Sequence, residues 1–404
     1  MRSGAFVLSL ALLIGLRQTG LKHPAKPWAF AILCIMALQL FWHPYINTVL
    51  AAVAQCAMYL AILAPLFWSS RLALDTNSFR WLIFILWGFH TLSAGIGVLQ
   101  AYYPMAFHFA ISNIIEEGIF GGEHLMITLA NGQKIFRPTG LSDIPGGAAS
   151  SGFYTLLFGM GIALQERNFL LRLLGAASIP IGLFCIYLSQ VRSTLILSGI
   201  CAIVLAVVLL LQKRFMQLIL LIGGTSAIAS ATLSWAFQVG GEETMSRLLT
   251  LTADQADKVV YQNRGFFLEY TLTDLLPEFP LGAGLGRWGM MNQYFGDYTN
   301  PMTRPIWVEI QWTGWLLDGG IPLVLAYGGI LIVSCWVAWQ IMMNRHLRSM
   351  QIWAGVVFAY NVGAIAITFN NPLFMSQAGM EFWLINTTLF VAAQAARKDS
   401  GLGT

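Results

Sequence analysis

The stretch STLILSGICAIVLAVVLLL, residues 193–211, runs for nineteen residues without a charged side chain. A helix that crosses a bilayer needs about 20 consecutive, mostly apolar residues, so this run is typical of a membrane span. The sequence therefore predicts an all-α polytopic membrane protein with about 11–12 transmembrane helices. Ten further apolar runs lie at about 4–16, 27–42, 47–68, 81–101, 146–164, 169–189, 215–237, 306–340, 351–370 and 375–395.

The composition agrees with this class. Of the 404 residues, 57% are hydrophobic and 10% are charged, whereas a soluble domain carries roughly 25% charged residues. We therefore expect a single membrane-embedded unit over residues 1–404. The net charge of +4 comes from scattered basic residues, which argues against nucleic-acid binding. The five cysteines fall in apolar segments without metal-ligand spacing, so we expect no disulfide.

The run at 306–340 is too long for one straight helix perpendicular to the membrane. It contains Gly319-Gly320-Ile321-Pro322, a sequence that disfavours a continuous helix. We expect this segment to break near these residues, to tilt, or to project beyond the bilayer.

The basic residues predict the orientation. Thirteen of the 22 Lys and Arg residues fall in alternate connections, and the short connections 43–46 and 371–375 carry none. The positive-inside rule makes the basic side cytoplasmic, including the C-terminus. The loops 102–145 and 238–305 are then external, and the larger one follows span eight. The thirteen are Arg17, Lys22, Lys26, Arg71, Arg80, Arg167, Arg172, Lys213, Arg214, Arg345, Arg348, Arg397 and Lys398.

Both external loops contain structural signals. Residues 124–137 place two short runs on either side of Asn131-Gly132, a turn sequence that predicts a β-hairpin. The stretch 255–276 predicts a helix that ends at Pro277. We therefore expect the large loop to be partly helical.

Several arginines lie on the predicted external side, where positive charge needs a separate reason. An anionic substrate such as a lipid-linked diphosphate is one, since guanidinium pairs with phosphate oxygens in a bidentate way. Glu309 lies at the predicted external end of a long apolar helix. The arginines are Arg137, Arg192, Arg247, Arg264, Arg287 and Arg304.

Other site chemistries lack their motifs. The chain has no P-loop sequence, and its six histidines do not cluster. The Gly282-x-Gly284-x-Gly286 pattern is interpreted as a close-packed turn. The first external connection, residues 43–46, contains no acidic residue that could hold a divalent cation. We therefore expect neither a metal nor a cofactor.

Four blocks, in order, resemble the O-antigen polymerase and O-antigen ligase superfamily. RPTGLSDIPGGA (137–148) is similar to its R-x-T-G-x-F-x-x-P-N-x-x-A pattern, and LSQVRSTL (188–195) to its S-R-x-x-x-L helix start. Arg264 followed by LPEFPLGAGLG (276–286) is similar to R…P-x-x-G-x-G-x-G. EIQWTGWLLDGG (309–320) stands where the family has H-N-x-x-L-x-x-L-x-E-x-G.

The resemblance implies an enzyme of the bacterial inner membrane that polymerises undecaprenyl-diphosphate-linked saccharide repeat units at the periplasmic face. Its implied partners are that glycan, membrane lipid and a chain-length regulator or flippase. Two positions depart from the pattern. Glu309 takes the place of the histidine that is the proposed base in ligases, and Gly146 replaces the asparagine of the first block. These departures favour a polymerase.

We expect Arg192 and Arg264 to bind the diphosphate and Glu309 to act as the general base, without metal. Each has an alternative: Arg192 snorkels to the interface, Arg264 pairs with Glu269 or Asp274, and Glu309 pairs with Arg304 or another loop arginine. The remaining loop arginines are expected to be solvated or to contact glycan, and Asp318 to bond the broken helix end. The secondary candidates are Arg137, Arg287, Arg304, Asp318 and Glu381.

Three other functions stay open. A ligase would transfer finished glycan from the carrier to lipid A–core or to a protein. A transporter of lipid-linked sugar should show two repeated halves with interrupted helices. If the protein were a purely structural membrane scaffold, the external arginines would have no function.

Overall fold

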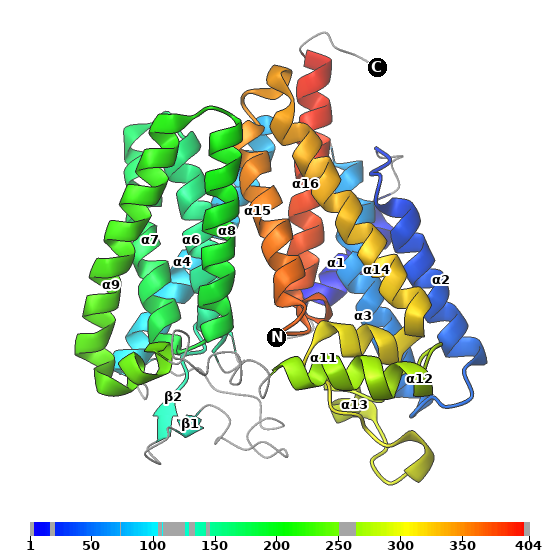
Figure 1. Ribbon diagram of the computed structural model, residues 1–404. Helices are drawn as coiled ribbons and strands as arrows, with labels where there is room; N and C mark the ends of the chain where they lie inside the picture. The colour runs from blue at the N-terminus through cyan, green and yellow to red at the C-terminus, as the bar shows by residue number, and fades with distance from the viewer. Residues whose placement is uncertain are drawn as a thin grey trace. The chain divides into compact units, whose positions relative to one another are not determined.

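The protein is described here by a computed structural model, in which residues 4–16, 21–72, 74–103, 107, 126–128, 134–142, 146–249 and 264–399 are placed. Each of the eleven predicted apolar runs forms a helix in this part of the chain (Figure 1). The helices are α1 (Gly4–Gly15), α2 (Lys26–Trp42), α3 (Val49–Trp68), α4 (Thr76–Tyr102), α6 (Gly147–Gln165), α7 (Phe169–Ser189), α8 (Arg192–Leu211), α9 (Phe215–Leu249), α14 (Gln311–Met343), α15 (Gln351–Ile367) and α16 (Gln377–Asp399).

Seven helices in the described ranges are long and apolar enough to cross a membrane, so the chain is a polytopic, mainly α-helical membrane protein. They are α3 to α4, α6 to α9, and α14. The helices α1, α2 and α15 are apolar but shorter. The predicted total of 11–12 spans therefore stays a prediction.

The chain divides into two compact units. The first comprises Met1–Phe79 and Asp257–Thr404, and the second comprises Arg80–Ala256. The expectation that residues 1–404 embed as a single unit stays a prediction.

Small residues bring α6 and α7 together in the second unit. A Cβ added at Gly152 would lie 2.7 Å from the carbonyl oxygen of Gly182, and one added at Gly159 would lie 2.9 Å from that of Gly175. Without side chains at these four positions the two backbones touch, the usual way in which membrane helices pack. In the same unit, Phe184 of α7 stacks on Trp235 of α9, with ring centroids 4.1 Å apart.

The second unit also contains two short paired strands where the sequence predicts a β-hairpin. β1 (Met126–Thr128) pairs antiparallel with β2 (Lys134–Phe136), in the register Ile127 opposite Ile135. The predicted Asn131-Gly132 turn lies outside the described residues.

The first unit is built around α14, which packs against α2 and α15. Its interior is aromatic: Trp315 stacks on Tyr327 with centroids 4.4 Å apart, and Phe374 contacts both rings. A further pair of buried amides, Asn361 of α15 and Asn386 of α16, exchange hydrogen bonds of 2.7 and 2.9 Å. Such mutual pairing satisfies polar groups that have no water to bond in a membrane interior.

The predicted break in the long apolar run is confirmed at Gly320. Its φ of 64° and ψ of −158° are non-helical and favour glycine, and a Cβ there would lie 2.2 Å from the Pro280 carbonyl oxygen. The first turns of α14 run across the direction of the remainder (Figure 1). Residues 321–343 alone are about 34 Å long at 1.5 Å per residue, enough to cross the hydrocarbon core.

Candidate functional site

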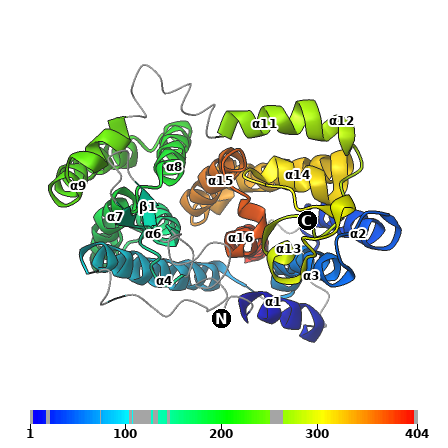
Figure 2. The same ribbon diagram turned by 90° about the horizontal axis from the view of Figure 1, so that it is seen from below.

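A short helical segment lies beside the start of α14 (Figures 1 and 2). It comprises α11 (Phe266–Tyr270), a π-helical turn (Thr271–Leu275) and α12 (Leu276–Glu278). The predicted helix at 255–276 is thus present from 264 onward, and residues 255–263 lie outside the described part. π-helical turns are rare and often accompany functional sites.

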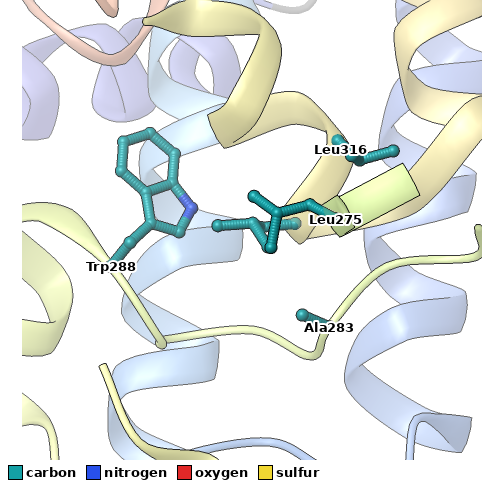
Figure 3. Packing of buried hydrophobic residues seen from close by; sticks show 5 residues of the cluster. Leu275, Ala283, Trp288 and Leu316 are labelled. Atoms are coloured by element: carbon teal, nitrogen blue, oxygen red, sulfur yellow. The ribbon is translucent and has the colours of Figure 1, made fainter. Parts of the chain in front are cut away.

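Apolar packing holds this segment in place. Figure 3 shows a cluster in which Leu275, Ala283, Trp288 and Leu316 converge. All are buried, and together with Leu317 they join the helical segment, the following loop and the first turns of α14. These contacts hold the helical segment, which follows Arg264, against the start of α14, which follows Glu309.

Arg264 and Glu309 form an ion pair, although 45 residues separate them. Glu309 Oε2 accepts from Arg264 Nη1, and Glu309 Oε1 accepts from Trp307 Nε1 at 2.8 Å. The side chains are 36% and 25% exposed, so solvent reaches the pair. Partial burial lowers the pKa of Arg264 from its ordinary value. Arginine nevertheless stays charged at neutral pH, because its ordinary pKa lies far above 7. The sequence left open that Glu309 pairs with Arg304 or with another loop arginine. The structure shows the second case, with Arg264 as the partner.

The loop after α12 is the close-packed turn that the sequence predicts. Gly282, Gly284 and Gly286 have φ of 106°, 98° and 75°. A Cβ at Gly284 would lie 1.9 Å from the Tyr45 carbonyl oxygen, so any side chain there would collide with the connection between α2 and α3.

Arg287 has a different role from the one predicted. It is only 7% exposed, and its guanidinium donates to the carbonyl oxygens of Ala283 at 2.9 Å and Arg304 at 3.2 and 3.1 Å. The Phe279 ring covers it, 5.6 Å away. The expectation of a solvated or glycan-contacting Arg287 is wrong, because loop carbonyls occupy its N–H groups. The Arg304 side chain is exposed.

The connection between α2 and α3 supports the same loop. Asn47 Nδ2 donates to the carbonyl oxygens of Asp297 at 2.9 Å and Thr303 at 2.8 Å. His43 Nε2 lies 3.2 Å from the Gly282 oxygen, and its Nδ1 accepts from the Tyr45 amide. Burial lowers the pKa of His43, which favours the neutral ring that these two bonds require. Sequence reasoning missed these residues, since nothing in their type reveals backbone partners more than 200 residues away.

Asp318 is completely buried and accepts from three side chains. Gln55 Nε2 and Tyr59 Oη donate to Oδ2 at 2.9 and 2.7 Å, and Trp288 Nε1 donates to Oδ1 at 2.8 Å. The expectation that Asp318 bonds the broken helix end is wrong. Backbone groups of the loop after α12 form hydrogen bonds with the backbone on both sides of the break instead. Ile321 N donates to Pro280 O, and Ala283 N donates to Leu317 O.

Arg192 and Arg137 lie in the second unit. Arg192 is the first residue of α8 and is half-buried. A Cβ added at Gly146, the residue before α6, would lie 3.0 Å from Arg137 Nη2 and 2.9 Å from Val191 Cγ2. Arg137 is thus beside the start of α8. The expected cooperation of Arg192 with Arg264 stays a prediction, because the two arginines belong to different units.

Glu381 lies on α16 and is 8% exposed. It accepts a 3.0 Å hydrogen bond from Gln377, one turn earlier on the same helix. Among the residues that the structure describes, no three His, Cys, Asp or Glu side chains group as metal ligands would. The Arg247 side chain is not among those described.

No protein-family model matches the chain, and no curated protein matches it either.

Proposed function

We propose that the protein is a glycosyltransferase that polymerises undecaprenyl-diphosphate-linked saccharide repeat units, without a metal, at the periplasmic face of the bacterial inner membrane. Arg192 and Arg264 bind the carrier diphosphate, and Glu309 accepts the proton of the attacking hydroxyl. The single observation that carries this proposal is the Arg264–Glu309 pair. This pair brings a cation and a carboxylate, the two groups that such a transfer needs, together at a solvent-accessible position.

The reaction makes modest demands on a protein, because the diphosphate is already a good leaving group. The acceptor oxygen bonds the anomeric carbon of the donor, and its proton passes to the Glu309 carboxylate. The bond from that carbon to the diphosphate oxygen breaks, and the electron pair leaves on the diphosphate. Guanidinium groups stabilise this growing negative charge, as preorganised cations do in other transfer sites. A positioned general base contributes typically 10²–10⁴-fold.

The position of the site also supports the proposal. Arg264 and Glu309 belong to the segments that the positive-inside rule makes external, and Arg192 begins an apolar helix at the same predicted side. A polyprenyl carrier presents its diphosphate at this depth. Glu309 stands where ligases of the resembled family have their histidine, which favours polymerisation over ligation.

Three variants test the proposal. Arg192→Ala, Arg264→Ala and Glu309→Gln should each abolish chain elongation in cells while the amount of protein in the membrane is unchanged. Arg167→Ala, an exposed arginine on the predicted cytoplasmic side, is the matched control and should elongate normally. Normal polymer length in all three variants would refute the proposal.

The ligase alternative gives a different phenotype. Loss of a polymerase leaves single repeat units attached to their acceptor, whereas loss of a ligase leaves long chains on the carrier. Purified protein incubated with a synthetic lipid-diphosphate repeat unit should yield a ladder of products. A single transfer to lipid A–core would assign the ligase reaction instead.

A further inference from the structure

Arg264 and Glu309 bind each other in the structure, although the proposed function gives them separate partners. Arg264 has to hold phosphate oxygens, and Glu309 has to accept a proton. Arginine pairs with carboxylate and with phosphate through the same N–H groups. A donor diphosphate and the Glu309 carboxylate therefore compete for the same guanidinium.

The two oxygens of Glu309 have different partners. Oε2 accepts from Arg264 Nη1, whereas Oε1 accepts from Trp307 Nε1 at 2.8 Å. Departure of Arg264 would free Oε2 and leave Oε1 bound to the indole. The carboxylate would then keep its position while one oxygen becomes available to an incoming hydroxyl.

The charges favour displacement by the donor. A diphosphate carries more negative charge, on more oxygens, than a single carboxylate. The existing pair is partly exposed, with side chains 36% and 25% accessible, so water screens it. Exposed ion pairs of this kind change an equilibrium by about fivefold or less. The resident carboxylate is thus a weak competitor that a bound donor can replace.

We infer that Glu309 occupies the diphosphate subsite of Arg264 while no donor is bound, and that the donor diphosphate displaces it and so frees Oε2 as the base. This inference rests on the proposed function. While Arg264 is paired with Glu309, the guanidinium stabilises the charged carboxylate and makes it a poor proton acceptor. Donor binding removes that partner, so the base becomes active only when the anomeric carbon is in place.

The test measures binding of undecaprenyl diphosphate to the purified full-length protein in detergent. Glu309→Gln removes the competing charge and should bind this probe about two- to fivefold more tightly than the unaltered protein. Arg264→Ala should bind it more weakly. In the double variant, Glu309→Gln should add no affinity to Arg264→Ala, because the competition needs the guanidinium.

A matched control separates competition from the general effect of charge. Asp274→Asn neutralises an exposed carboxylate on the same helical segment, ten residues from Arg264, and leaves the ion pair intact. It should change the affinity less than Glu309→Gln does. If Glu309→Gln does not fold, Glu309→Asp, whose shorter side chain weakens the pair, should still bind the probe more tightly.

The outcomes distinguish the inference from the proposed function. Equal or weaker binding by Glu309→Gln would overturn the inference, and weaker binding would indicate that Glu309 positions Arg264. Weaker binding by Arg264→Ala would still support the proposed diphosphate contact in that case. Unchanged binding by Arg264→Ala would overturn both that contact and the inference.

Discussion

The indole Nε1 of Trp288 donates a 2.8 Å hydrogen bond to Asp318 Oδ1 and so joins the glycine-rich loop to the last turn before the break in α14. The other oxygen of Asp318 bonds Gln55 and Tyr59 of α3. One buried carboxylate therefore connects three segments that are distant in sequence. A buried carboxylate loses its water, and the three donor groups replace part of that hydration with hydrogen bonds.

Asp318→Asn should destabilise the protein more than Tyr59→Phe. Tyr59→Phe removes one hydrogen bond to a charged group, worth about 1.5–3 kcal/mol. Asp318→Asn weakens all three bonds and turns an amide N–H₂ toward groups that are themselves donors. Thermal unfolding in detergent measures both effects, with the exposed Tyr45→Phe as the control. Equal stability of Asp318→Asn and the unaltered protein would show that this carboxylate is not a structural connection.

Gly320→Ala should disrupt the break in α14. The positive φ costs a non-glycine residue of order 1–3 kcal/mol, and the added Cβ would meet the Pro280 carbonyl oxygen at 2.2 Å. Gly328→Ala lies on the same helix with nothing within 4 Å of its Cβ, so it is the matched control. The control should leave stability unchanged or raise it by up to about 1 kcal/mol. The melting temperatures of the two variants check this, and equal melting temperatures would contradict the observed break.

Stability should fall as the pH drops below about 6.5, partly because of His23. Burial lowers the pKa of His23 from 6.5 to about 3. Between pH 6.5 and about 3, the unfolded chain binds a proton at His23 that the folded chain does not bind. Each pH unit in this range lowers the free energy of unfolding by about 1.4 kcal/mol. Above pH 6.5 the His23 ring is neutral in both the folded and the unfolded chain and adds no pH dependence, and the destabilisation grows as the pH falls from 6.5 toward 3.

His23→Asn is the variant that checks the pH dependence. The Asn oxygen can still accept from the Ala25 amide, as His23 Nδ1 does at 3.1 Å, but it does not titrate. Unfolding measured between pH 7 and 4.5 should show a flatter dependence for this variant. His346→Asn, at an exposed position, should keep the original slope. Parallel curves for His23→Asn and the unaltered protein would refute the assignment.

Elongation by the purified protein should survive EDTA. Arginines neutralise the diphosphate in the proposed reaction, so chelation of divalent cations removes no required charge. The product ladder from a synthetic lipid-diphosphate repeat unit, with and without EDTA, measures this. Loss of the ladder that Mg²⁺ restores would overturn the metal-independent reaction.

The sequence alone determined the helices. A membrane span must satisfy its backbone within one segment and bury about 20 apolar residues, and both requirements are local. The eleven predicted runs are therefore helices, and Gly319-Gly320-Ile321-Pro322 marks the break in α14 because its backbone preferences are local as well.

Only the tertiary structure decided what the charged and polar residues contact. Arg264 meets Glu309 across 45 residues, Tyr59 meets Asp318 across 259, and the arginine at 287 is enclosed by carbonyls rather than exposed to glycan. A residue type states which bonds a side chain can make. Its partner depends on how separate helices pack, and no local pattern in the chain encodes that arrangement.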